Sequence, residues 1–145
     1  MRCLVQRVTS ASVRVAGEMI GKTDGGLMIL ACAMQGDTAK NVEVMARKLV
    51  NMRIFRDADG KTNRSVSDVG GSILMVSQFT LSADTSSGNR PGFSAAADPE
   101  LGRELFDLLV EQVESYGVHV ETGSFGAEME VSLVNDGPMT IWIEK

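Results

Sequence analysis

The sequence predicts an α/β fold in which two helices cover one side of a mixed sheet or of two stacked sheets. Three observations favour it. Segments rich in apolar and β-branched residues occupy positions 4–8, 11–15 and 26–33. Apolar residues repeat at helical spacing in two segments, which begin near Asp37 and Asp98, and further strand-like segments follow each predicted helix. With 145 residues, of which 43% are apolar and 23% charged, the chain fits a single domain spanning residues 1–145.

The first third of the chain is typical of short strands separated by turns. Turn-prone residues lie at 9–10, 16–17 and 23–26, and the close spacing of the strands predicts antiparallel neighbours. Apolar residues at 42, 45, 46 and 49 then indicate an amphipathic helix, with Asp37 or Thr38 as its N-cap. Residues 53–55 predict a short strand and 57–61 a turn. The alternating Asp residues of this turn lack the late glutamate that a calcium loop needs.

Residues 70–81 are the most informative part of the sequence. Two glycines precede the uninterrupted apolar run 73–76, which is typical of a strand covered on both faces. Ser77, Gln78 and Thr80 follow at once, where the buried run ends. Polar side chains at the end of a rigid strand predict a functional site, although the strand could equally well end at the surface without one.

The second half contains a long loop, a helix and further strands. Residues 82–97 are rich in Ser, Gly and Ala, which is typical of a functional or mobile loop. Asp98 as N-cap and Pro99 at the first helical position begin a helix, and Gly117 is placed to end it. Residues 118–122 predict a strand and 123–127 a loop. The alternating segments 129–134 and 139–143, on either side of 135–138, predict a hairpin or a strand–loop–strand.

Composition excludes several classes of site. The net charge of −5 argues against a broad nucleic-acid surface, so any such contact is local. Cys3 and Cys32 lie among apolar neighbours and are expected to be buried thiols. Because His119 is the only histidine, the usual zinc ligands are missing, and neither a metal site nor a cofactor is predicted. The sequence has no membrane span and no signal peptide, which predicts a cytoplasmic protein.

The remaining chemistry rests on hydroxyls, an amide and the backbone. No Ser-His-Asp arrangement and no glycine-rich phosphate loop is present, and His119 is expected to be a packed or surface residue. Ser77, Gln78 and Thr80 can form hydrogen bonds, and backbone N–H groups near Phe79 and Thr80 could stabilise an oxyanion if the strand end leaves them unpaired. Such a site suffices only for a labile bond.

Two segments taken together resemble the paired signatures of the D-aminoacyl-tRNA deacylases. They are Ser77-Gln78-Phe79-Thr80-Leu81 and Asn135-Asp136-Gly137-Pro138-Met139-Thr140. Further segments extend the resemblance over essentially the whole chain: Gln6-Arg7-Val8, Arg53-Ile54-Phe55, Gly70-Gly71-Ser72, Arg90-Pro91 with Phe93, and Val131-Ser132-Leu133-Val134. Two departures are visible. Met139 stands where the family usually has Val, and Gly92 where Ser is common.

The resemblance implies a three-layer α/β fold of stacked, largely antiparallel β-sheets with two helices covering one side. It also implies hydrolysis of the ester that joins a D-amino acid, or glycine, to the 3′-terminal adenosine of tRNA, by a homodimer in which the two signatures meet across the interface. Ser77 to Thr80 would hold the carbonyl and the adenosine, with the backbone amides of Phe79 and Thr80 as oxyanion donors and the RNA 2′-OH assisting. Thr80 as the nucleophile is the competing hypothesis.

Chiral selection is assigned by the resemblance to the loop around Gly137-Pro138. In the family this peptide bond is cis, and its carbonyl oxygens recognise the α-amino group in the partner's pocket and exclude an L side chain. Met139 and Gln6 belong to the same expected site, and Arg7 is expected to brace the loop, the alternative being a solvated cation at a sheet edge. Arg90, Phe93 and Asn135 are weaker candidates for contact with tRNA.

Two rival functions remain open at this point. One is an ester hydrolase for other small acyl adducts, and the other is a non-catalytic dimer that binds RNA ends. The sequence leaves undecided which D-amino acids are preferred, which tRNA features beyond the acceptor end are read, and which face forms the dimer.

Overall fold

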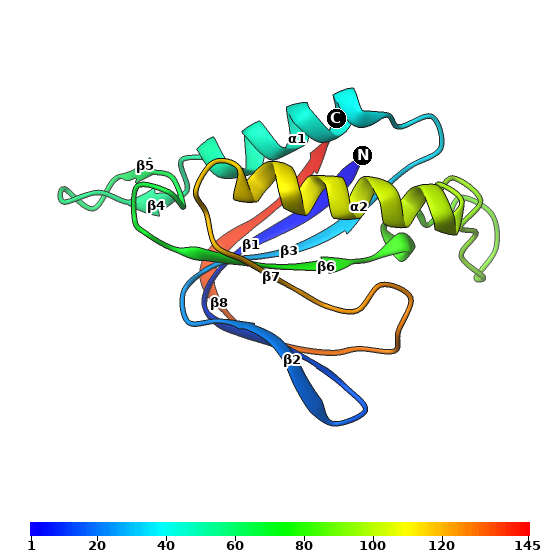
Figure 1. Ribbon diagram of the computed structural model, residues 1–145, viewed down its shortest axis with the longest axis horizontal. Helices are drawn as coiled ribbons and strands as arrows, with labels where there is room; N and C mark the ends of the chain where they lie inside the picture. The colour runs from blue at the N-terminus through cyan, green and yellow to red at the C-terminus, as the bar shows by residue number, and fades with distance from the viewer.

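The computed structural model describes residues 1–145 and has three layers (Figure 1). The strands are β1 (Arg2–Val15), β2 (Glu18–Thr23), β3 (Gly26–Cys32), β4 (Phe55–Arg56), β5 (Thr62–Arg64), β6 (Ser72–Ser77), β7 (Val120–Thr122) and β8 (Glu130–Glu144). The helices are α1 (Ala39–Asn51), the 3-10 helix η1 (Phe79–Ser82) and α2 (Pro99–Glu114). Helices α1 and α2 lie side by side on one face of the sheet (Figure 1).

The main sheet has six strands in the order β2-β1-β3-β6-β7, with β8 paired to the other side of β1. Its β3–β6 and β6–β7 pairs are parallel, and the remaining pairs are antiparallel. The first half of β1 pairs with β3 and its second half pairs with β2, so the hydrogen-bonded sheet folds back on itself. The predicted α/β fold of stacked, largely antiparallel layers with two helices on one side is therefore confirmed.

Strand β6 contributes to both hydrophobic cores. Ile73 and Met75 point into the larger core beneath the helices, whereas Leu74 and Val76 point into a smaller core against the folded-back layer. All four are essentially inaccessible to solvent, and each contributes about 1.5–3 kcal/mol by burial. The uninterrupted apolar run thus marks a strand covered on both faces, as predicted. Because this strand is rigid, it fixes the position of Gln78 and of η1, which follow Ser77.

Both predicted helices form close to the expected residues. Thr38 is the N-cap of α1, and its N–H donates to Asn41 Oδ1 at 3.0 Å. Asp98 is the N-cap of α2, which buries Leu105, Leu109 and Val113 against the sheet and ends before Gly117. Neither helix has the length and apolar character needed to cross a bilayer.

Two local predictions were wrong, and for a third the structure decides between two alternatives. Residues 9–10 do not form a turn, because β1 continues through them. At this point its register with β8 shifts and its other neighbour changes from β3 to β2. Strand β2 was not predicted, since most of its side chains are exposed and show no apolar pattern. The last two strand segments do not form a hairpin: both halves of β8 pair with β1, which leaves the strand–loop–strand alternative.

The stacking of the layers depends on a close approach at Gly21 of β2. A Cβ atom placed there would lie 2.8 Å from the carbonyl oxygen of Thr122 and 3.2 Å from Leu74 Cδ1. We expect Gly21→Ala to lower the free energy of unfolding by about 1–3 kcal/mol, since backbone must move to make room. Urea denaturation measures this. Gly92→Ala is the control, because its Cβ meets nothing closer than 4.0 Å; equal stability of the two variants would contradict the close packing.

Candidate active site

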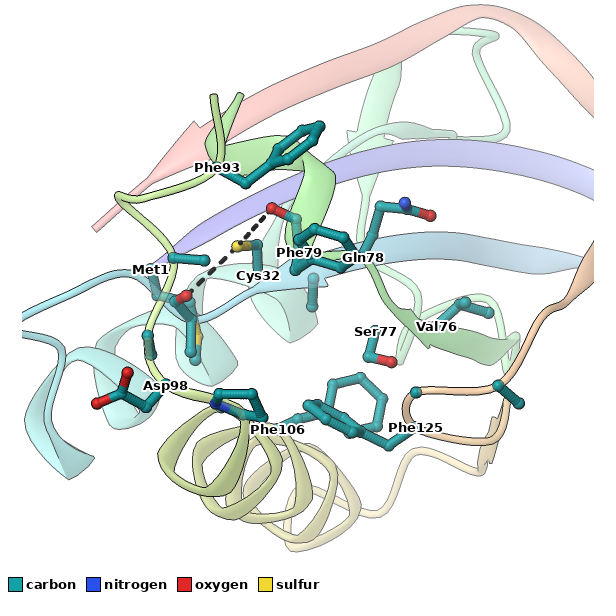
Figure 2. A pocket seen from close by; sticks show the side chains of 18 of the residues that line it. Met1, Cys32, Val76, Ser77, Gln78, Phe79, Phe93, Asp98, Phe106 and Phe125 are labelled. Carbon is teal, nitrogen blue, oxygen red and sulfur yellow. Dashed lines mark hydrogen bonds between the residues drawn. The ribbon is translucent and has the colours of Figure 1, made fainter. Parts of the chain in front are cut away.

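A cavity of about 680 Å³ opens at the carboxyl end of β6 (Figure 2). Its walls come from the ends of β3 and β6, the loop before α2, the first turns of α2 and the loop before β8. The lining residues are Met1, Ala31, Cys32, Ala33, Gln35, Val76, Ser77, Gln78, Phe79, Phe93, Ser94, Ala96, Ala97, Asp98, Pro99, Gly102, Phe106, Phe125, Gly126, Ala127, Met129 and Val131. Fourteen of the 22 are hydrophobic, which is typical of a small-molecule pocket with a few orienting polar groups.

The structure brings Ser77, Gln78 and Phe79 together at this cavity. The Gln78 N–H donates to the Ala31 carbonyl at 2.8 Å, which is the last hydrogen bond between the β6 and β3 backbones before η1 turns the chain. Thr80 does not line the cavity. Its hydroxyl accepts a hydrogen bond from the Gln78 amide, so the two side chains hold one another.

The first backbone N–H groups of η1 lie next to the cavity wall. Phe79 and Thr80 supply the first N–H groups of a 3-10 helix, which have no partner inside it. Neither N–H donates to a loop, turn or side-chain acceptor in the structure. An oxyanion site requires backbone donors of this kind, and of the two residues Phe79 lines the cavity whereas Thr80 follows it directly.

Aromatic side chains shape two sides of the cavity. Phe79 and Phe93 pack edge to face with ring centroids 5.2 Å apart, and Phe79 is 60% exposed. Phe106 of α2 and Phe125 pack at 6.2 Å on the helix side (Figure 2). Sequence reasoning missed Phe106 and Phe125, because a helical core residue and a loop aromatic carry no local signal of a site.

The thiol of Cys32 forms part of the cavity wall. Cys32 is buried, as predicted, and its sulfur lies 3.6 Å from the Phe79 carbonyl oxygen (Figure 2). Burial raises the pKa of the Cys32 thiol, although the Arg2 guanidinium nearby acts in the opposite direction. Cys3, deeper in the core, has its pKa raised by burial to about 12. Both thiols are therefore protonated at neutral pH and poor nucleophiles.

The second predicted segment forms a bulge in β8. Gln6 pairs with Thr140 and Val8 with Asn135, so residues 136–139 bulge out opposite Arg7. Asn135 closes this bulge: its amide donates to the carbonyls of Arg7 at 2.9 Å and Met139 at 3.1 Å. Gly137 and Pro138 at the tip are exposed, and the peptide bond between them is cis.

Arg7 supports the bulge from beneath. Only 2% of its surface is exposed, so it is not the solvated cation that was the alternative. Arg7 Nε lies 2.8 Å from Asp136 Oδ2, an ion pair without hydrogen-bond alignment, and a terminal guanidinium nitrogen donates to the Ile54 carbonyl. Gln6 bonds to Thr140 Oγ1 at 3.2 Å, and Met139 packs against the larger core.

Within one chain the bulge and the cavity are far apart. Ser77 pairs with Ala31 of β3, whereas Arg7 pairs with Leu27, about 13 Å earlier on that strand. Strands β3 and β1 also separate β6 from β8, which adds about 14 Å across the sheet. No residue of 135–139 lines the cavity.

The other candidate residues lie in different places. Phe93 lines the cavity, whereas Arg90 lies outside it in the exposed loop before α2. His119 is exposed at the opposite end of β6, where its carbonyl accepts from the Ile73 N–H.

Known proteins resemble this chain over its full length. The family model described as D-Tyr-tRNA(Tyr) deacylase matches residues 4–144. The chain belongs to this family. A D-aminoacyl-tRNA deacylase of Dinoroseobacter shibae is 60% identical over 144 residues, covering 99% of both chains. Another, of Desulfitobacterium hafniense, is 54% identical and covers 99% of this chain and 97% of the relative.

Solved structures share the fold of this chain. The structure titled c-Myc DNA Unwinding Element Binding Protein superposes with a TM-score of 0.94 at 40% identity, covering 100% of this chain and 99% of that one. A probable eukaryotic D-amino acid tRNA deacylase has the same fold, with a TM-score of 0.83 at 17% identity. As a member of the deacylase family, the protein is a hydrolase that acts on ester bonds.

The state of the Cys32 thiol predicts its reactivity. Because burial raises its pKa, the thiolate that iodoacetamide attacks forms only at alkaline pH. We expect alkylation of the native protein to have a midpoint above pH 9.0, the ordinary value, and to be at least about tenfold slower at pH 7.5 than in urea. Mass spectrometry of samples taken at successive times measures the rate of alkylation at each pH. A rate that levels off below pH 9 would indicate a stabilised thiolate.

Proposed function

We propose that the protein hydrolyses the ester between a D-amino acid and the 3′-terminal adenosine of tRNA in the cytoplasm, acting as a homodimer. Glycyl-tRNA mischarged on tRNA(Ala) is a second substrate. Each site combines the cavity beside Ser77 to Thr80 of one protomer with the Gly137-Pro138 bulge of its partner. Family membership supports the reaction, and the geometry of the single chain supports the sharing of the site.

The observation that carries this proposal is the separation of the two signatures. The bulge is exposed, is held at its base by the buried Arg7, and contributes no residue to the cavity of its own chain. A loop braced in this way is suited to insertion into a second molecule. Exposed apolar residues on β8, Val134 at 56% and Trp142 at 48%, favour a partner on the same side.

The chemistry follows from the groups at the cavity. An aminoacyl ester next to a ribose 2′-OH is already labile, so positioning and oxyanion stabilisation can supply the rate. The N–H groups of Phe79 and Thr80 bind the developing oxyanion, and the 2′-OH of the RNA assists. Ser77 and Gln78 position the ester.

Thr80 is the weaker candidate for the nucleophile. Its hydroxyl is engaged by the Gln78 amide, and it does not line the cavity. The only histidine, which could have served as a base, lies at the other end of β6. Thr80 therefore acts by holding Gln78 and by supplying its backbone N–H.

Selection between enantiomers uses the partner's bulge. Carbonyl oxygens at Gly137 and Pro138 accept hydrogen bonds from the α-amino group, and Met139 forms the adjoining wall. A D side chain then points to open space and an L side chain meets the bulge, so discrimination arises by exclusion. Glycine has no side chain to exclude and is accepted.

The exposed aromatic pair is placed to receive the terminal adenine. Phe79 and Phe93 stand at the cavity with accessible faces, and bases stack on such rings. Asn135 acts indirectly, by holding the bulge, and Arg90 reaches the RNA from its exposed loop.

The proposal is tested by incubating the pure protein with D-Tyr-tRNA, L-Tyr-tRNA and a small activated ester. We expect release of D-tyrosine at least about 100-fold faster than L-tyrosine, which corresponds to roughly 2.7 kcal/mol of discrimination, and little cleavage of the small ester. Quench-flow with thin-layer separation of the labelled products gives the rates. Equal release of both enantiomers would identify a promiscuous esterase, and binding without release would identify an RNA-end-binding dimer.

A further inference from the structure

The positive charges of this acidic protein are unevenly placed. Six of its 14 Lys and Arg residues, but only two acidic residues, fall between positions 47 and 64. They extend from the last turns of α1 through the β4–β5 hairpin, which lies beside the carboxyl end of α1 (Figure 1). All six are exposed, and together they form the basic surface: Arg47, Lys48, Arg53, Arg56, Lys61 and Arg64.

No carboxylate forms an ion pair with the basic surface. Of the five ion pairs in the protein, none includes a member of it. The two acidic residues of the hairpin form no ion pair with it either, and Asp57 Oδ1 accepts the N–H groups of Asp59 and Lys61 within the turn. Hydrogen bonds from Ser65 lower the pKa of the exposed Asp68 carboxyl, and the charges of Arg64 and Arg53 lower it further. Arg53 and Arg64 donate only to neutral oxygens, and the other four make no side-chain hydrogen bond. The side chains of Arg47, Lys48, Arg56 and Lys61 are therefore free to bind an external anion.

The hairpin is also tied to the proposed selection loop. Arg7 donates to the carbonyl of Ile54, the residue before β4, and pairs with Asp136 in the β8 bulge. The basic surface therefore stands beside the loop that enters the partner's cavity. The neighbouring helix has the opposite character, with five acidic residues and one basic residue between Pro99 and Glu114.

We propose that the basic surface binds backbone phosphates of the tRNA acceptor stem. This inference rests on the proposed function, which brings the 3′ end to the partner's cavity next to the bulge. The stem then passes over the hairpin, while acidic α2 repels it and restricts its direction. A local patch of this kind reconciles a net charge of −5 with a polyanionic substrate.

The test compares two double variants of the full-length protein. Arg56→Gln with Lys61→Gln removes two charges from the β4–β5 hairpin, and Arg14→Gln with Lys22→Gln removes two exposed charges from the β1–β2 hairpin. Binding of uncharged tRNA is measured by fluorescence anisotropy from 50 to 300 mM KCl. Hydrolysis of D-tyrosyl-adenosine, which lacks the stem, is measured in parallel.

We expect the β4–β5 variant to bind tRNA at least about tenfold more weakly at low salt, and the slope of log K against log salt to fall by about 1.5. Its rate on D-tyrosyl-adenosine stays within twofold of the unmodified protein, and the β1–β2 control keeps the original slope. An unchanged slope in the β4–β5 variant, or an equal fall of the slope in both variants, would contradict the proposal that the basic surface binds the acceptor stem. Failure of the proposed function appears separately, as absence of hydrolysis in the unmodified protein.

Discussion

The proposed site depends on the contacts that the buried guanidinium group of Arg7 makes. It lies where four residues of β8 leave the antiparallel pairing with β1, and it contacts both Asp136 in the bulge and the Ile54 carbonyl before β4. A buried charge is costly unless it is paired, and here Arg7 is buried whereas the Asp136 side chain is about half exposed. The same side chain thus fixes the exposed loop and the base of the basic hairpin.

Rigidity also explains how a site without a strong nucleophile can work. Strand β6 is buried on both faces, and the backbone turns into η1 directly after Ser77, so the N–H groups of Phe79 and Thr80 are held in place without cost at the moment of reaction. Cys32, the one thiol at the cavity, is kept protonated by burial. The cavity can therefore contribute positioning and backbone N–H dipoles to catalysis. These contributions suit a substrate whose ester is already activated.

Much of this architecture was predictable, and the failures have physical reasons. The run 73–76, the N-cap and proline of α2 and the glycines at turns are local signals, and they gave the helices and the central strand. Strand β2 and the continuity of β1 through residues 9–10 depend on tertiary pairing, which no local pattern reports. Ser77 to Phe79 lie at the cavity as predicted, but Phe106 and Phe125 reach it only through the packing of α2 and the loop before β8. That the two signatures lie apart in one chain could not be deduced from their spacing either.

The sharing of each site between two chains is tested most directly by complementation. Ser77→Leu fills the cavity, and Gly137→Leu, where a Cβ would make only ordinary van der Waals contact with Asn135 Oδ1 at 3.7 Å, enlarges the bulge. Each homodimer is therefore expected to be inactive towards D-Tyr-tRNA. Mixed and allowed to exchange subunits, the two variants form heterodimers with one intact site, and about a quarter of the unmodified activity returns. If the mixture stays inactive while its subunits exchange, the cavity and the bulge of one chain serve the same site, and the proposed arrangement is wrong.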